Sequence, residues 1–380
     1  MNNNHKKILH LSLDDKFTDM AIYYFEQLAP EENDSVVYSP HSTLQYIHTH
    51  SNIVSTKQEV LELNLNNYNL IVIHSLVDIW YELILNSPID IPIVWVGWGF
   101  DYYDFIDTEL LLSQTNRFNR KNNMLSIWKH QVKRLLSNWK INRLPDRVDV
   151  IKRINYFAPV LESEYALVAK QLDLGDKMPR YIDFNYGSLE RNYIRSYANK
   201  EICGNNILIG NSATATNNHL EIFQLLKKFD VSDRIIICPL SYGDEIYKNK
   251  ILKLGIESFK EQFQPLANFM PVDDYIMKVL SCRYVIMNHV RQQALGNIIT
   301  MLYLGAKVFL REENPVYSFL KRINAVVYSV QALEQQGALA MLTPLSQNDV
   351  LQNQRVLKGF IGEKIVLNKT QNLILLRNCV

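Results

Sequence analysis

The stretch that decides the fold is Tyr284–Tyr303, which reads YVIMNHVRQQALGNIITMLY. Its first part, Tyr284–Asn288, has the apolar composition of a buried strand, and its last part, Ile298–Tyr303, that of an apolar helix. Between them lies the polar turn Arg291–Asn297. Backbone N–H groups at the start of a helix have no partner within the helix and attract anions. Because the guanidinium of Arg291 adds a fixed charge, we expect a phosphate site at this turn.

The rest of the chain repeats this alternation of short apolar runs and longer amphipathic ones, which is typical of parallel sheets covered by helices. The expected strands are Lys7–Leu13, Ser35–Tyr38, Leu70–His74, Ile91–Trp98, Ile154–Pro159, Arg180–Phe184, Asn206–Gly210, Arg234–Pro239, Ile256–Phe263, Tyr284–Asn288 and Lys307–Leu310. The expected helices include Thr18–Leu28, Ser163–Gln171, Asn218–Phe229, Asp244–Leu254, Val272–Leu280 and Leu295–Leu304. The pattern breaks near Tyr186–Asn205, where polar and charged residues replace it.

The length and composition indicate two globular α/β domains. The chain has 380 residues, of which 47% are hydrophobic and 21% charged, and its formal net charge is +1. This length exceeds one typical domain, and the charge gives no reason to expect a nucleic-acid partner. We expect a Rossmann-like domain over residues 1–190 and a second over 200–345. A helical segment, 346–380, would pack back on the first domain.

A second strand-to-helix turn in the C-terminal half carries small polar residues. Gly210, Asn211 and Ser212 follow the strand Asn206–Gly210. Glycine permits close backbone approach, while amides and hydroxyls can donate to phosphate or sugar oxygens. The alternative is an ordinary turn with helix caps. Both this turn and the Arg291 turn would open at the carboxyl edge of one sheet, where such sheets bind ligands.

Carboxylates after two strands of the N-terminal half are candidates for a general base. Asp101 follows the strand Ile91–Trp98 among aromatic residues, and Asp14, Asp15 and Asp19 follow the first strand. A general base must lie within hydrogen-bond reach of the hydroxyl that it deprotonates. Either group could supply it, and the alternative for each is a helix cap or a solvated turn.

The segment 117–153 departs from the neutral balance of the chain, with eleven Lys or Arg against two acidic residues. The apolar residues Trp128, Val132, Leu135, Leu136 and Trp139 recur in it at helical spacing. The basic residues Lys129, Lys133 and Arg134 lie between them. Such a helix suits a surface of anionic lipid. The alternative is a helix that packs its apolar stripe on its own domain.

Several classes of protein are excluded by motifs that the sequence lacks. It has no Walker A loop, nucleophile elbow or HExxH motif, and its nine histidines show no metal-ligand spacing. No Asp-x-Asp occurs, which argues against a sugar transferase that holds its diphosphate through a divalent metal. We therefore expect no metal and no cofactor. The four cysteines form no CxxC pair and no apolar run is long enough to span a bilayer, so we expect a cytoplasmic location.

Taken together, the motifs resemble the TDP-N-acetylfucosamine:lipid II N-acetylfucosaminyltransferases, glycosyltransferase family 56. The resemblance extends from the first strand to about residue 320. It is carried, in order, by Trp98-Gly99-x-Asp101-x-Tyr103, Gly210-Asn211-Ser212 with His219, Arg291-Gln292-Gln293 with Gly296, and Arg311-Glu312-x-Asn314-Pro315. One departure is Ala294-Leu295, where the family pattern has Gly-Ile.

The resemblance implies a metal-independent GT-B fold, with two Rossmann-like domains facing across a cleft. The C-terminal half would hold a nucleotide-sugar donor, TDP- or UDP-linked, and the N-terminal half a polyprenyl-diphosphate-linked acceptor at the inner membrane face. Arg291 would bind the donor diphosphate, and Asp101 or Asp15 would be the base. The other donor residues implied by these motifs are Gly210, Asn211, Ser212, Gln292, Gln293, Gly296, Glu312 and Asn314.

The resemblance also favours a membrane-facing role for Trp128, Lys129, Lys133, Arg134 and Trp139. Two other functions share the two-domain architecture. One is a nucleotide-sugar epimerase, and the other is a non-catalytic protein that binds a phosphorylated ligand.

Overall fold

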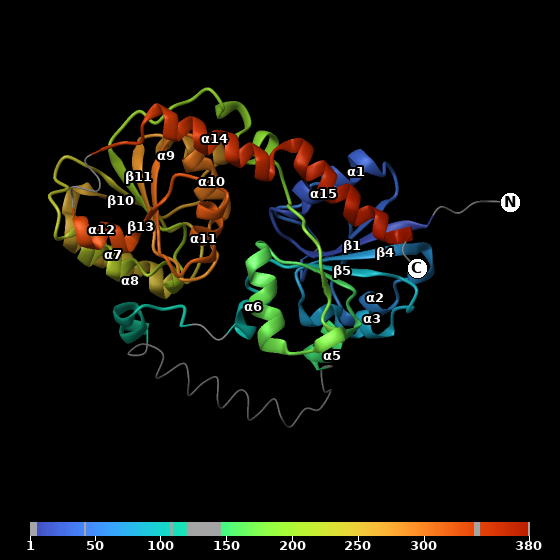
Figure 1. Cartoon of the computed structure of the whole chain (residues 1–380). Coiled ribbons are helices and arrows are strands. Elements are labelled where there is room, and N and C mark those ends of the chain that lie inside the picture. The colour runs from blue at the N-terminus through green and yellow to red at the C-terminus, as the bar shows by residue number, and fades with distance from the viewer. Residues whose placement is uncertain (1–5, 42, 107–108, 120–145, 338–342, 379–380) are drawn as a thin grey trace. The chain divides into compact units, whose positions relative to one another are not determined.

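The computed structural model describes residues 6–41, 43–106, 109–119, 146–337 and 343–378. The chain divides into two compact α/β units (Figure 1). The first comprises Met1–Asp107, Asn142–Asn192 and Gly359–Val380, and the second comprises Thr108–Ile141 and Tyr193–Lys358. Each unit is built around a parallel sheet, as the alternation of apolar and amphipathic runs predicted.

The first unit contains a seven-stranded parallel sheet within the described residues, in the order β3-β2-β1-β4-β5-β6-β7. Its strands are β1 Lys7–Leu13, β2 Asn33–Tyr38, β3 Asn52–Val54, β4 Tyr68–His74, β5 Ile93–Val96, β6 Tyr156–Ala158 and β7 Arg180–Tyr181. Its helices are α1 Thr18–Leu28, α2 Lys57–Leu61, α3 Tyr81–Asn86, α5 Arg147–Arg153, α6 Glu162–Leu172 and α15 Glu363–Leu375. The strand order changes direction between β1 and β4, so the loops after these two strands diverge.

The last helix of the chain, α15, completes the core of the first unit. It lies beside α1 in Figure 1. Its residues Leu373 and Ile374 are buried in one cluster with Ile8 of β1 and Phe25 of α1. Burying such side chains is the main favourable contribution to folding, so the first unit depends on residues from both ends of the chain.

Among its described residues, the second unit contains a six-stranded parallel sheet in the order β10-β9-β8-β11-β12-β13. Its strands are β8 Asn206–Ile209, β9 Ile236–Pro239, β10 Phe263–Leu266, β11 Cys282–Met287, β12 Lys307–Leu310 and β13 Tyr328–Ser329. Its helices are α7 His219–Leu226, α8 Glu245–Phe259, α9 Val272–Val279, α10 Leu295–Tyr303, α11 Pro315–Arg322 and α12 Val330–Gln336. A further helix, α14 Gln347–Ile361, contains the boundary at which the chain returns to the first unit.

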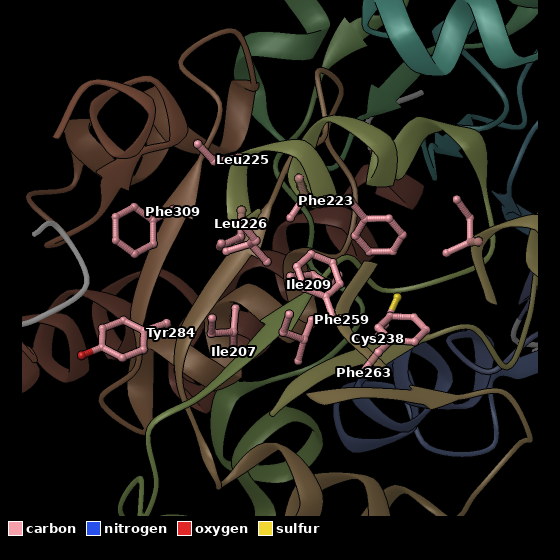
Figure 2. Close-up of a cluster of buried hydrophobic side chains, with 14 of the residues drawn as sticks. Ile207, Ile209, Phe223, Leu225, Leu226, Cys238, Phe259, Phe263, Tyr284 and Phe309 are labelled. Carbon is pink, nitrogen blue, oxygen red and sulfur yellow. The ribbon is translucent and has the colours of Figure 1, made fainter. Parts of the chain in front are cut away.

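An aromatic core holds the helices on one face of the second sheet (Figure 2). Phe223 of α7 contacts Phe259 of α8 and Phe263 of β10, with ring centroids 5.6 and 5.7 Å apart. Both pairs meet edge to face, which is a favoured arrangement of aromatic rings. This core fixes the positions of α7 and α8, and therefore of the loops that precede them.

The observed strands differ from the expected ones at one misplaced strand and two brief edge strands. The strand expected at Ile256–Phe263 is wrong, because Ile256 lies within α8 and is exposed, and the strand begins only at Phe263. The apolar residues near the end of the amphipathic helix α8 have the sequence pattern of a short strand. The brief edge strands β3 and β13 were not predicted, because each contributes only a few residues to its sheet.

Residues 109–119, the docking segment, bind the second unit, although the domain limits expected from the sequence placed them in the first. The Glu221 carboxylate accepts hydrogen bonds from Gln114 N and Thr115 N, at 2.9 and 3.0 Å, and from Thr115 Oγ1 at 2.6 Å. Asn218 Oδ1 accepts from Leu112 N at 2.9 Å. Phe118 packs against the aromatic core of the second unit.

Candidate functional site

Two loops lie next to each other at the carboxyl edge of the second sheet. The β8 loop, residues 210–218, follows β8, and the β11 loop, residues 288–294, follows β11. The two strands are parallel neighbours, with Ile209 paired to Ile286. The strand order changes direction between them, since β9 and β10 lie on one side and β12 and β13 on the other. Open α/β sheets bind ligands at this point, because the loops diverge there.

Gly210 begins the β8 loop with a backbone that favours glycine. Its φ is +62°, and a Cβ atom at this position would lie 2.7 Å from Asn217 Oδ1 and 2.8 Å from His219 Nε2. A larger residue would therefore be strained and would push these two side chains away. Gly210 allows the turn to close on Asn217, which then organises the loop.

Asn217 is fully buried and braces both loops. Its Oδ1 accepts from the backbone N–H of Asn211 and from Nε2 of His289, each at 2.8 Å. Its Nδ2 donates to Ser212 Oγ and to the carbonyl oxygen of Thr214, each at 3.1 Å. Because every contact is made inside the protein, Asn217 sets the loop conformation.

Gln293 joins the β11 loop to the β8 loop at the surface. Its Nε2 donates to Asn211 Oδ1 at 2.9 Å. Its Oε1 accepts from Thr216 Oγ1 at 2.7 Å and from Nε of Arg291 at 3.2 Å. The guanidinium of Arg291, which is partly exposed, is therefore tied to the hydroxyl-rich β8 loop. A cationic fork beside hydroxyl and amide donors is suited to a phosphate group.

The start of α10 supplies backbone N–H groups at the same edge. The residue before the helix, Ala294, has a left-handed backbone with a φ of 60°. Gly296 was predicted as a donor residue, but its surroundings give a packing reason for the glycine. A Cβ atom there would lie 3.0 Å from a ring carbon of Tyr193. Gly296 lets α10 approach that ring.

Two buried histidines beneath the loops remain neutral. Burial lowers the pKa of His219 to about 3, and burial together with the charge of Arg291 lowers the pKa of His289 to about 3. His219 Nε2 and His289 Nδ1 have no hydrogen-bond partner among the described residues. His289 donates from Nε2 to Asn217 Oδ1, so in the described contacts it orients the Asn217 side chain.

Three predicted donor residues have other roles or surroundings. Asn314 is the N-cap of α11, where its Oδ1 accepts from Val316 N at 2.9 Å, and its Nδ2 donates to the carbonyl oxygen of His289 at 3.1 Å. It is fully buried, so it is a structural cap and not a donor ligand. Gln292 is also buried, whereas Glu312 is exposed and its backbone N–H donates to Gln331.

In the first unit, Asp101 is not placed to act as a base. Its carboxylate is buried and accepts from the backbone N–H of Leu76 at 2.9 Å, the backbone N–H of Trp98 at 2.8 Å and Nε1 of Trp95 at 2.7 Å. Burial raises its pKa, and these hydrogen bonds oppose the rise. The side chain ties the ends of β4 and β5 together, which is a structural role.

Asp15 follows β1 and is only partly buried. It accepts from Phe17 N at 2.6 Å, Thr18 N at 3.0 Å and Thr18 Oγ1 at 2.6 Å. Burial nevertheless raises its pKa to about 6. Its neighbours Asp14 and Asp19 instead accept backbone N–H groups of residues 45–49 and hold that loop. A pKa of about 6 suits Asp15 to act as a general base near neutral pH.

A comparison with known protein families finds a match that covers the part of the chain with these loops. Residues 188–354 match the family described as 4-alpha-L-fucosyltransferase glycosyl transferase group 56. The matched range includes both loops and the sheet that carries them. This part of the chain is similar to glycosyltransferase family 56. The resemblance predicted from the motifs is confirmed, and the protein is a glycosyltransferase.

Solved structures show that the glycosyltransferase has the GT-B fold predicted for it. HepE from Anabaena in complex with UDP is similar, with a TM-score of 0.64, 10% identity, and 98% of this chain and 100% of that chain covered. A glycosyltransferase from Rickettsia africae ESF-5 gives 0.61 and 12%, covering 98% and 99%. Sucrose-phosphate synthase from Thermosynechococcus elongatus gives 0.61 and 12%, covering 98% and 100%.

One residue of the glycosyltransferase site was missed from the sequence. The hydroxyl of Tyr242, in the loop after β9, accepts from Asn211 Nδ2 at 2.7 Å. A parallel bridge between Ala213 and Gly243 joins its loop to the β8 loop. The sequence signal is Gly243, whose φ of +123° places it against the backbone of Ala213.

The predicted membrane-facing residues Trp128, Lys129, Lys133, Arg134 and Trp139 of the glycosyltransferase lie outside the described residues. In the part of the chain that the structure describes, no helix is long and apolar enough to cross a membrane. The described side chains also include no cluster of three or more His, Cys, Asp or Glu that could hold a metal ion.

Proposed function

We propose that the glycosyltransferase moves a deoxy or acetamido sugar from a nucleoside-diphosphate donor, TDP- or UDP-linked, to a glycan acceptor. The acceptor is linked to a polyprenyl diphosphate, or is another cell-surface glycan. The single observation that carries the donor half of this proposal is the Gln293 bridge, which holds Arg291 against the β8 loop. The similarity to HepE, which was crystallised with UDP-glucose, supports a nucleotide sugar as the donor.

The diphosphate is held without a metal ion in this proposal. Arg291 and the N–H groups at the start of α10 stabilise the negative charge that develops on the leaving diphosphate. Gly210 lets the β8 loop close on Asn217, and the buried side chains of Asn211 and Ser212 support the loop from within the protein. The partly exposed Thr216 adds a hydroxyl group beside Gln293 and Arg291. The absence of an Asp-x-Asp motif from the sequence supports the same conclusion.

The acceptor hydroxyl attacks the anomeric carbon of the donor sugar, and the diphosphate leaves. In an inverting reaction a general base accepts the proton of that hydroxyl, and we assign this role to Asp15 of the first unit. Its raised pKa makes it a better proton acceptor than an ordinary aspartate while leaving it ionised at neutral pH.

A lipid-linked acceptor requires the enzyme to work at a membrane surface. We place it in the cytoplasm, bound peripherally to the inner face of the cell membrane. The sequence of the segment 117–153 supports this location, because its basic residues and tryptophans suit anionic lipid.

A transfer assay tests the proposal. The full chain is incubated with labelled TDP- or UDP-sugars and a polyprenyl-diphosphate-linked saccharide, with EDTA or with Mg²⁺. We expect labelled lipid-linked product at equal rates in both conditions. Activity only with Mg²⁺ would contradict the metal-independent mechanism. Isomerised donor without use of the acceptor would indicate an epimerase, and donor binding without turnover would indicate a binding protein.

A further inference from the structure

Four aromatic side chains gather near the ends of β1 and β5 in the first unit. Trp98 contacts Phe17 and Tyr186 edge to face, with each pair of ring centroids 5.4 Å apart. Phe17 and Tyr186 are 5.8 Å apart, and Phe100 lies 6.3 Å from Trp98. The four residues come from three separate parts of the sequence, so the fold assembles them. We call them the aromatic surface.

This aromatic surface is not an ordinary part of the core. The Phe100 side chain is 53% exposed, although burying it would be favourable. The indole Nε1 of Trp98 is enclosed but has no hydrogen-bond partner among the described residues. The Trp95 indole nearby instead donates to Asp101 at 2.7 Å. An enclosed N–H without an acceptor is destabilising, so this position is suited to an oxygen atom that arrives with a ligand.

The aromatic surface adjoins the proposed base. The backbone N–H of Phe17 donates to Asp15 Oδ1 at 2.6 Å, and the ammonium group of Lys16 lies 5.2 Å from the centre of the Phe17 ring. A ring bound on the aromatic surface would therefore lie close to a carboxylate that can accept a proton. This proximity to the proposed base relates the surface to the acceptor.

We propose that the aromatic surface binds a sugar ring of the acceptor, whose apolar C–H face packs on the exposed ring of Phe100 beside the edge of Trp98. Trp98 Nε1 donates to a hydroxyl or acetamido oxygen of that sugar. The inference rests on the proposed function, since it assigns the acceptor subsite of the same reaction. Aromatic side chains suit such a ligand because they offer a rigid apolar face at a small entropic cost.

The variant Phe100→Ala tests the packing. We expect the KM for the acceptor to rise about tenfold, because one aromatic contact is lost, while the affinity for nucleoside diphosphate stays unchanged. The matched control is Phe269→Ala, which removes an 80% exposed ring from the second unit. An acceptor KM that is unchanged in Phe100→Ala, or equally changed in Phe269→Ala, would overturn the proposal.

The variant Trp98→Phe tests the indole N–H while keeping an aromatic ring. We expect the acceptor KM to rise about fivefold and the melting temperature to stay the same or increase, because an unpaired buried donor is removed. A purely structural Trp98 would give a lower melting temperature with no change in the acceptor KM, which would contradict the proposal.

The chemistry of the acceptor separates a sugar site from a lipid site. Each variant is assayed with the same saccharide on a short and on a long prenyl chain. An equal rise in KM for both acceptors supports a sugar ring on the aromatic surface. A rise confined to the long-chain acceptor would mean that the prenyl chain is bound there, and the inference would fail while the proposed function stands. Absence of transfer by the unaltered protein would defeat the proposed function itself.

Discussion

Arg291 is oriented by an uncharged neighbour, because Gln293 accepts from its Nε and carries contacts to Asn211 and Thr216. Replacing Arg291 by Ala should lower the affinity for nucleoside diphosphate or the turnover at least about tenfold, since a charge-assisted hydrogen bond to phosphate is worth roughly 1.5–3 kcal/mol. Calorimetry with UDP and TDP measures this effect. The control is Arg180→Ala, which removes an exposed arginine of the first unit. Unchanged affinity and rate would remove Arg291 from the site.

The raised pKa of Asp15 predicts that the reaction rate depends on pH. Because its pKa is raised to about 6, the base is protonated below that pH, and kcat/KM should rise with pH through about 6 and then level off. Asp15→Asn should lower kcat by roughly 10²-fold or more, and the rise of kcat/KM with pH should disappear. A pH–rate profile of both proteins tests the assignment. A rise that persists in the variant would exclude Asp15 as the base.

The same shift has the opposite consequence for stability. A carboxylate whose folded pKa is above its unfolded pKa favours the folded state when protonated. That contribution is complete below pH about 4 and is lost as the pH rises through about 6. Asp15→Asn should therefore not be less stable than the parent at pH 8 on this account. Chemical denaturation at pH 5 and pH 8 checks the direction.

Ala294 has a left-handed backbone immediately before α10. This conformation costs a residue with a Cβ atom roughly 1–2 kcal/mol, whereas glycine adopts it freely but gains entropy when unfolded. Ala294→Gly should stabilise the protein by about 0.5 kcal/mol and leave donor affinity unchanged. Urea denaturation measures the difference. Ala332→Gly, inside α12, is the control and should be destabilising by about 0.5–1 kcal/mol.

At the scale of elements, the docking segment depends on two side chains at the start of α7, Asn218 and Glu221. Glu221→Ala removes three hydrogen bonds to Gln114 and Thr115. Faster amide exchange over residues 110–118 is the expected result, because each lost bond contributes roughly 1 kcal/mol. Glu257→Ala, on the exposed face of α8, is the control and should leave this exchange unchanged. Equal protection in parent and Glu221→Ala would show that the segment is held by other contacts.

The elements around the β8 and β11 loops were predictable because strand, turn and helix follow one another locally, as at Tyr284–Tyr303. The roles of several site residues could not be predicted from the sequence. Asp101 looks like a catalytic carboxylate after a strand, but its partner Leu76 N comes from a different loop, and sequence proximity does not show that contact. Asn314 likewise looked like a ligand, and its burial follows from the packing of the β11 loop over it. Local patterns predicted the turns, whereas tertiary contacts decided which side chains stay accessible.

At the scale of the whole molecule, the described strands of the two sheets follow the same order over the first six strands of each, and β7 extends the first sheet. In both sheets the change of direction lies between the first and fourth strands. Sequence alternation predicted two such units, and the solved structures confirm the class. The sequence did not predict which unit the segment 109–119 would join. The contacts of Asn218 and Glu221 with residues 110–115 join positions more than a hundred residues apart, and no local sequence pattern predicts them.

The dependence of the first unit on α15 gives a prediction at this scale. Leu373 is fully buried against β1 and α1, whereas Leu375 is 47% exposed. Leu373→Ala should destabilise the first unit by about 2–5 kcal/mol, because it removes buried methyl groups and leaves a cavity. Leu375→Ala should cost under about 0.5 kcal/mol. Thermal denaturation of both variants compares them, and similar losses would mean that α15 does not pack as described.

The return of α15 to α1 also sets an order of events on the ribosome. The strands of the first unit are translated before those of the second, whereas α15, which closes their apolar face, is translated after both sheets. The sheet of the second unit, β8 to β13, is complete before α15 leaves the exit tunnel. A nascent chain can therefore complete the sheet of its second unit first, while the core of the first unit stays open until translation reaches α15.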